Sequence, residues 1–131
     1  MKEKLIEEAT KAMEHAYVPY SNFRVGAAVL MKSGKIYTGA NIENSSYGAT
    51  VCAERVAIFK AISEGETEIE EIAVVTETET PSSPCGICRQ VIAEFSDNAK
   101  IILANTKGKV IETSLSELLP MAFTKKDLHN K

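Results

Sequence analysis

The chain has 131 residues, which is enough for one domain with its own hydrophobic core. Its composition, 44% hydrophobic and 25% charged, is ordinary for a globular protein, and no apolar stretch approaches the roughly 18 residues of a membrane span. The net charge of −3, with acidic residues gathered between positions 64 and 79, disfavours a nucleic-acid partner. We therefore expect a single domain over residues 1–131, with no nucleic-acid or membrane partner and a small neutral substrate.

The first residues predict a helix. Apolar residues recur with the spacing of one helix face over residues 2–17, and Pro19 ends the pattern. The N-terminus is charged and lacks the apolar core of a signal peptide, so we expect a cytoplasmic protein. A reducing compartment disfavours disulfides, which leaves metal binding or catalysis as the better use of the three cysteines.

The next segments predict a hairpin and a loop. Small and β-branched apolar residues over 25–31 and 36–40 flank a turn at 32–35, a pattern typical of two antiparallel strands. Residues 41–51 lack periodicity and are rich in Asn, Ser, Gly and Thr, which predicts a long loop. Long loops of this kind are often functional.

Helices and strands alternate in the second half of the chain. We expect helices over 52–63 and 85–95, strands over 72–76, 100–104 and 110–113, and a last helix that runs from a capping box at 114–117 to Pro120, before a polar tail. The turn at 105–109 is too short for a parallel crossover, so the last two strands must be antiparallel. The two middle helices are expected as crossovers. The predicted architecture is an α/β fold with a mixed sheet that is parallel in its middle and has antiparallel first and last strands.

All three cysteines lie at the starts of the two crossover helices. Cys85 and Cys88 are three residues apart, so both thiols share one face of a helix turn, and Cys52 opens the other helix. Neighbouring crossovers on one side of a sheet bring their helix starts to the same edge, where ligands usually bind. We therefore expect the three sulfurs to hold one zinc ion per chain.

The predicted zinc site has an open position. Structural zinc has four protein ligands, whereas catalytic zinc has three and a water molecule whose pKa falls to roughly 7. His15 falls on the polar face of the first helix and His129 in the tail, so neither is placed to close the site. Glu54, two residues after Cys52, is the expected proton shuttle. In isolation it would be an ordinary acidic residue at a helix start.

The charge of such a site needs compensation, because three thiolates and a hydroxide leave Zn²⁺ with a net charge of about −2. The positive ends of two helices point at it. Arg55 and Arg89 each follow a cysteine and are candidates to donate hydrogen bonds to the thiolates. Arg55 is the stronger candidate, and the alternative for both is an ordinary surface arginine.

These motifs resemble a known family. Cys52-Ala53-Glu54, followed by Pro84-Cys85-Gly86-Ile87-Cys88, matches the three-cysteine variant of the zinc nucleobase deaminase signature. Nearly the whole chain is similar to the small homotetrameric cytidine deaminases of nucleoside salvage. The blocks that carry this resemblance are residues 20–28, 39–44, 52–55, 84–90 and 117–120.

The resemblance implies a fold and a reaction. The fold is the three-layer α/β/α cytidine deaminase-like fold with a five-stranded sheet, and the reaction is hydrolysis of cytidine and deoxycytidine to uridine and deoxyuridine plus ammonia in pyrimidine salvage. Zinc-bound hydroxide attacks C4 of the base, and Glu54 moves the proton from water to N3 and to the leaving ammonia. The alternative is a deaminase of a related nucleoside such as blasticidin S. The last antiparallel strand disfavours a polynucleotide-editing enzyme, and the missing fourth ligand disfavours a non-enzymatic zinc module.

The resemblance also implies substrate contacts. Phe23 is expected to pack against the base, which the backbone around Ala53 also contacts. Asn41 and Glu43 are expected to hydrogen-bond the ribose hydroxyls, although a turn residue and a core aromatic are the plainer interpretations of Asn41 and Phe23 alone.

Tyr47 and Phe123 match two further positions of the family. In the family's homotetramer, residues at these positions reach from one subunit into the pocket of its neighbour and complete it. Phe123 is an apolar residue in a polar tail, so it is expected against a partner chain or, equally well, against its own core.

Overall fold

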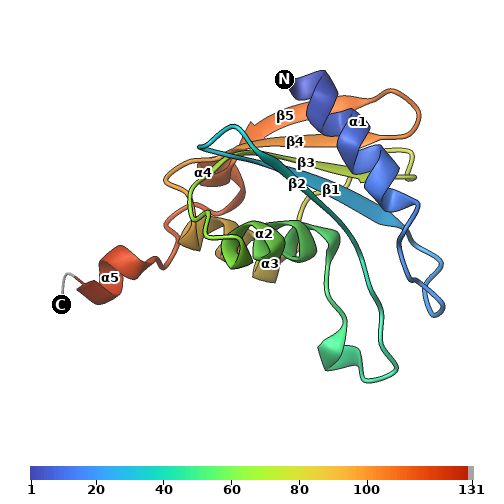
Figure 1. Cartoon of the computed structure of the whole chain (residues 1–131), viewed down its shortest axis with the longest axis horizontal. Coiled ribbons are helices and arrows are strands. Elements are labelled where there is room, and N and C mark those ends of the chain that lie inside the picture. Colours follow the sequence, from blue (N-terminus) through green and yellow to red (C-terminus); the bar gives the residue numbers. More distant parts are fainter. Residues whose placement is uncertain (130–131) are drawn as a thin grey trace.

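A computed structural model of the chain describes residues 1–129 and shows one central sheet with helices on both faces (Figure 1). The strands are β1 (Val25–Met31), β2 (Ile36–Ala40), β3 (Ile69–Thr76), β4 (Lys100–Asn105) and β5 (Val110–Ser114). The helices are α1 (Lys2–Met13), the 3₁₀ turn η1 (Tyr47–Ala49), α2 (Ala53–Ser63), α3 (Gly86–Glu94), α4 (Leu115–Leu118) and α5 (Lys125–His129). None of the helices within residues 1–129 is long and apolar enough to cross a membrane.

The sheet has five strands in the order β2-β1-β3-β4-β5. Strands β3 and β4 are parallel, whereas β1 is antiparallel to both of its neighbours and β5 is antiparallel to β4. The predicted mixed sheet with an antiparallel last strand is therefore confirmed. The position of β1 inside the sheet was not predicted, and the crossover through α2 consequently passes over β1 on its way from β2 to β3.

Two apolar clusters define the layers. Helix α1 packs on one face of the sheet, where Leu5, Ala9 and Met13 meet sheet residues of one parity such as Ala28 and Val75. Helices α2 and α3 pack together on the opposite face, against the sheet residues of the other parity. This arrangement is the predicted three-layer α/β/α fold, and it places the starts of α2 and α3 on the same side of the sheet.

Two glycines let the helices approach the sheet with backbone against backbone. A Cβ atom at Gly26 would lie 2.0 Å from the carbonyl oxygen of Ala9 in α1. A Cβ atom at Gly39 would lie 2.6 Å from the amide nitrogen of Ala57 and 2.7 Å from the carbonyl oxygen of Ala53 in α2. Only a residue without a side chain fits at these positions, and Gly39 thereby sets how deeply the first turn of α2 sits on the sheet.

Three local predictions need correction. Helix α1 ends at Met13, four residues early, because the backbone of Tyr17 pairs with the loop after β2: its amide donates to Asn41 O (2.9 Å). The capping box does not form, since the hydroxyl of Ser114 contacts that of Ser116 and makes no capping hydrogen bond. The polar tail contains a short helix, α5, that its composition did not indicate.

The substitution Gly39→Ala is expected to lower the free energy of unfolding by about 1–3 kcal/mol, because the added methyl group forces the backbone of α2 away from the sheet. Urea denaturation at fixed zinc concentration measures the change. Gly48→Ala is the matched control, since nothing lies within 4 Å of a Cβ atom there. Equal stabilities of the two variants would contradict the close packing.

Candidate metal centre

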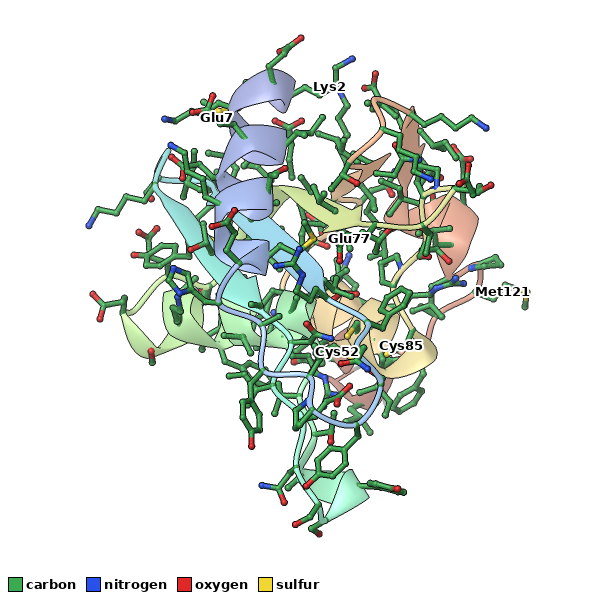
Figure 2. All side chains as sticks on the ribbon, turned by 90° about the vertical axis from the view of Figure 1, so that its right-hand side faces the viewer. Lys2, Glu7, Cys52, Glu77, Cys85 and Met121 are labelled. Atoms are coloured by element: carbon green, nitrogen blue, oxygen red, sulfur yellow. The ribbon has the colours of Figure 1, made fainter. Side chains whose placement is uncertain are left out.

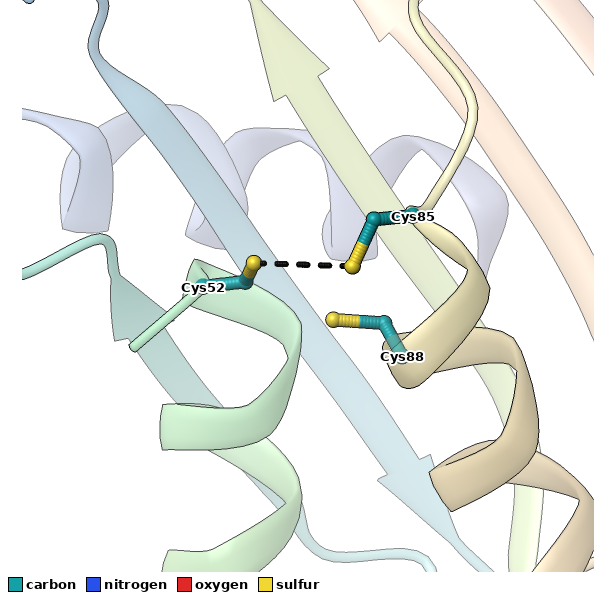
Figure 3. A group of neighbouring side chains, drawn as sticks. All are labelled: Cys52, Cys85 and Cys88. Carbon is teal, nitrogen blue, oxygen red and sulfur yellow. Dashed lines mark hydrogen bonds between the residues drawn. The ribbon is translucent and has the colours of Figure 1, made fainter. Parts of the chain in front are cut away.

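Three sulfur atoms converge between the starts of α2 and α3 (Figure 3). Cys52 and Cys85 are the N-cap residues of α2 and α3, with extended backbones (φ −71°, ψ 152° and φ −67°, ψ 168°), and Cys88 lies on the first turn of α3. The Sγ atoms of Cys52 and Cys85 are 3.7 Å apart, and all three sulfurs lie within 4.8 Å of one another. Figure 2 shows Cys52 and Cys85 together, far from Lys2 and Glu7 of α1.

The three thiols fit a zinc ion. Sulfurs bound to tetrahedral zinc at about 2.3 Å lie roughly 3.8 Å apart, close to the observed spacing. Among the described residues, no fourth metal-ligating side chain joins the group. His15 is exposed in the turn after α1, and the side chain of His129 lies outside the described residues. Three cysteine ligands, from exposed Cys85 to buried Cys88, thus suit one zinc ion with an open position.

The environment of the thiols favours ionisation of one of them. A hydrogen bond with Cys88 is the main cause that lowers the pKa of Cys52 to about 5, and Arg55 adds to the effect. The same hydrogen bond, together with burial, raises the pKa of Cys88. The positive ends of α2 and α3 point at the group and stabilise negative charge on it. Cys52 is therefore the first of the two to become a thiolate.

Arg55 contacts the sulfur group directly. Its Nη2 lies 3.6 Å from Cys52 Sγ and 3.5 Å from the carbonyl oxygen of Thr50. The thiol of Cys52 is also the main cause that raises the pKa of Arg55. This guanidinium therefore supplies positive charge beside the thiolates.

Arg89 has different partners. Its three nitrogen donors are bound, each at 2.8 Å, to the carbonyl oxygens of Pro84 and Leu118 and to the hydroxyl of Ser83. These bonds join the loop before Cys85 to α4. All described hydrogen bonds of Arg89 thus go to oxygen atoms, whereas Arg55 contacts the sulfur of Cys52.

Glu54 is buried beside the sulfurs, in the first turn of α2, with 4% of its surface exposed. Burial is the main cause that raises its pKa to about 7, and the charge of Cys52 raises it further. A carboxyl group of this pKa can both accept and return a proton near neutral pH. The extended backbone of Cys52 allows this neighbouring side chain to lie on the same side as the sulfurs.

Asn41 and Glu43 both bind the segment that carries Phe23, residues 20–25, which we call the strap. Asn41 accepts a hydrogen bond from the amide of Val25 (3.0 Å) and donates one to the carbonyl oxygen of Phe23 (2.8 Å). Glu43 accepts hydrogen bonds from the amides of Tyr20 (3.0 Å) and Ser21 (3.2 Å) and from the hydroxyl of Ser21, and these bonds lower its pKa. The two predicted sugar ligands therefore also hold the strap in place.

The remaining predicted contacts differ in exposure. Ala53 is fully buried, Phe23 is 41% exposed, and Tyr47 is 81% exposed in the arm that projects from the molecule between β2 and α2 (Figure 1). Phe123 is 56% exposed, and its carbonyl oxygen accepts a hydrogen bond from Gln90 of α3. The role of Gln90 as the anchor of this tail was not predicted, although Gln90 lies only two residues after Cys88.

A buried carboxyl group beside three convergent thiols defines a zinc site of hydrolytic type. The family model described as the cytidine and deoxycytidylate deaminase zinc-binding region matches residues 1–104. The chain therefore belongs to this family, and its group of three cysteines fits the one zinc ion per chain that the family's zinc-binding region holds.

Individual relatives agree with this membership. A protein named cytidine deaminase from Sporosarcina psychrophila is 58% identical over 127 residues, which cover 96% of this chain and 93% of the relative. The crystal structure of cytidine deaminase from Burkholderia pseudomallei superimposes with a TM-score of 0.90 at 48% identity and covers 94% of this chain and 99% of that chain. A protein named blasticidin-S deaminase from Bacillus cereus is 32% identical over 129 residues, with 92% and 91% of the two chains covered.

We expect the substitution Arg55→Gln to weaken zinc binding about 10- to 100-fold, because it removes the positive charge that contacts Cys52. Competition with a chromogenic chelator measures the affinity. Lys60→Gln, on the exposed last turn of the same helix, is the control and should bind zinc like the parent chain. Equal affinities of the two variants would remove Arg55 from the charge balance of the site.

Proposed function

We propose that the protein is a cytidine deaminase that hydrolyses cytidine and deoxycytidine to uridine and deoxyuridine plus ammonia. The observation that carries this proposal is the buried carboxyl group of Glu54 beside the three convergent thiols of Cys52, Cys85 and Cys88. Membership of the deaminase family and the name of the relative at 58% identity support it.

The chain's own residues account for the proton movements of this reaction. When bound by the three cysteines, zinc would act as a Lewis acid and lower the pKa of a water molecule to about 7. Glu54 accepts a proton from that water and gives it to N3 of the base, and it then carries the second proton of the water to the amino group, which leaves as ammonia. Addition of water at C4 and loss of ammonia thus replace the amino group with a carbonyl oxygen. Arg55 stabilises the thiolates throughout.

The strap and the loop after β2 form the proposed nucleoside site. Phe23 packs against the base, and the buried backbone at Ala53 supports the base from the start of α2. Asn41 and Glu43 bind the ribose hydroxyls. Each has capacity left after its bonds to the strap, since Asn41 Nδ2 carries a second hydrogen and Glu43 Oε2 accepts from Ser21 alone among the described residues.

We expect the purified zinc-loaded chain to turn over cytidine, and the substitution Glu54→Gln to lower kcat at least 1,000-fold while one zinc ion per chain is kept, because the amide cannot accept the proton. The ultraviolet change as uridine forms and elemental analysis measure the two quantities. A parent chain that holds zinc but converts blasticidin S and not cytidine or deoxycytidine would replace the proposed substrate. Activity retained in the variant would remove Glu54 from the mechanism.

The proposed enzyme is a cytoplasmic homotetramer whose pockets are shared between subunits. Exposed aromatic side chains on the arm and the tail, Tyr47 and Phe123, support an assembly in which each subunit completes a neighbour's pocket. A hollow of about 390 Å³, which a neighbouring subunit would cover, is lined by four apolar residues, Phe59, Ile87, Val91 and Phe95, and by Gln90 and Glu94. A reducing cytoplasm suits a site made of three free cysteines.

We expect light scattering to give four times the mass of the chain.

Phe123→Ala should lower activity, and co-expression of this variant with the inactive Glu54→Gln variant should restore part of it. In a mixed tetramer, the pocket of a Phe123→Ala chain keeps its own Glu54. A neighbouring Glu54→Gln chain supplies the intact Phe123 that this pocket lacks. Mixed tetramers that are no more active than the Phe123→Ala variant alone would contradict shared pockets.

A further inference from the structure

Arg24 and Glu77 form a bidentate ion pair at the end of the sheet nearest the sulfur group. Arg24 Nε donates to Glu77 Oε1 (3.1 Å) and Nη2 donates to Oε2 (2.8 Å). The antiparallel register of β1 and β3 pairs Val25 with Thr76, so Arg24 and Glu77 are opposite each other one step beyond the last paired residues. The two side chains thus continue the pairing of β1 with β3 where the backbone ladder stops.

The pair lies on the opposite face of the sheet from the proposed base contact. Val25 packs against the cluster under α2 and α3. Phe23 and Arg24 directly precede β1, and the alternation of the strand, continued by two residues, would put Phe23 on the α2 side and Arg24 on the α1 side. Glu77 is the main cause that raises the pKa of Arg24. The charge of Glu14, which directly follows α1, also raises this pKa, in agreement with a place on the α1 side. Arg24 can therefore hold the strap without occupying the space of the substrate.

The strap has fixed points on both sides. Asn41 and Glu43 hold it on the side of β2, and the Arg24–Glu77 pair is the side-chain hydrogen-bond contact that ties it to the end of β3 within residues 1–129. The loop that follows Glu77 is itself held by hydrogen bonds. Asn105, 5% exposed, donates from Nδ2 to the carbonyl oxygens of Thr78 (3.0 Å) and Glu79 (2.8 Å) in the loop that follows.

We propose that Arg24 and Glu77 are positioning residues that hold Phe23 in the orientation needed to bind the base. This inference rests on the proposed function, because it assigns the pair a role in nucleoside binding. Neither residue touches Glu54 or the sulfurs in the described contacts, so the pair acts on substrate affinity through the strap and leaves the proton transfers alone. The Lys32–Glu68 pair (3.1 Å), at the opposite end of β1 and β3, is a more exposed ion pair, with side chains 68% and 64% exposed against 40% and 46% for Arg24 and Glu77, and it has no strap to hold.

The test compares Arg24→Gln and Glu77→Gln with Lys32→Gln. We expect each of the first two variants to raise KM for cytidine about three- to fivefold with kcat changed less than twofold, the size of effect that an exposed ion pair of good geometry supports. The double variant Arg24→Gln/Glu77→Gln should be no worse than either single variant. The reversed pair Arg24→Glu/Glu77→Arg should bring KM back to within twofold of the parent. Lys32→Gln should leave KM unchanged.

Hydrogen exchange supplies a readout that does not depend on activity. Amides of residues 20–25 should exchange faster in Arg24→Gln and Glu77→Gln than in the parent chain, and at the parent rate in Lys32→Gln. An unchanged KM with unchanged exchange in both variants, or equal effects of Lys32→Gln, overturns the inference. A parent chain that holds zinc but does not turn over cytidine refutes the proposed function instead, and the exchange rates still decide whether the pair holds the strap.

Discussion

Three sulfur atoms that would carry like charge as zinc ligands are held within 4.8 Å of one another, and most of the structure follows from this constraint. Two helices of 11 and 9 residues point their positive ends at the group, and one guanidinium adds a full charge. Both helices must therefore lie on one face of the sheet and start at one edge. The position of the buried carboxyl group at the start of α2 is a consequence of the same arrangement.

The close approach of α2 to the sheet links this constraint to the core. Gly39 lets the backbone of Ala53 lie against β2. Ala53, between Cys52 and Glu54, is therefore held in place by close backbone packing. The loop after β2 then returns past Tyr17 before it reaches Cys52. Strap, loop and helix start are thus ordered by contacts with one another, and the proposed substrate site lies where they meet.

The elements and the metal ligands could be predicted because their signals are local. Cys85 and Cys88 have the spacing of one helix turn, and periodicity gave each strand within a few residues. The place of β1 next to β3 could not be predicted, because the pairing joins segments far apart in the chain, from Val25 with Thr76 to Met31 with Ile69, and no local signal in either segment indicates its partner. The Arg24–Glu77 pair could not be predicted from the sequence for the same reason. The substrate contacts came from resemblance to a family, and spacing alone would not have suggested them.

Cys52 and Cys85 occupy the N-cap positions of their helices, yet neither side chain makes the capping hydrogen bond that Ser, Thr, Asp or Asn makes there. The first turns of α2 and α3 therefore depend on what the sulfurs bind. A zinc ion bound by both cysteines would join the two helix starts, so that binding of the metal would stabilise both first turns together. Glu54 lies in one of them. Helix order, metal content and the position of the buried carboxyl group are thus linked in this chain.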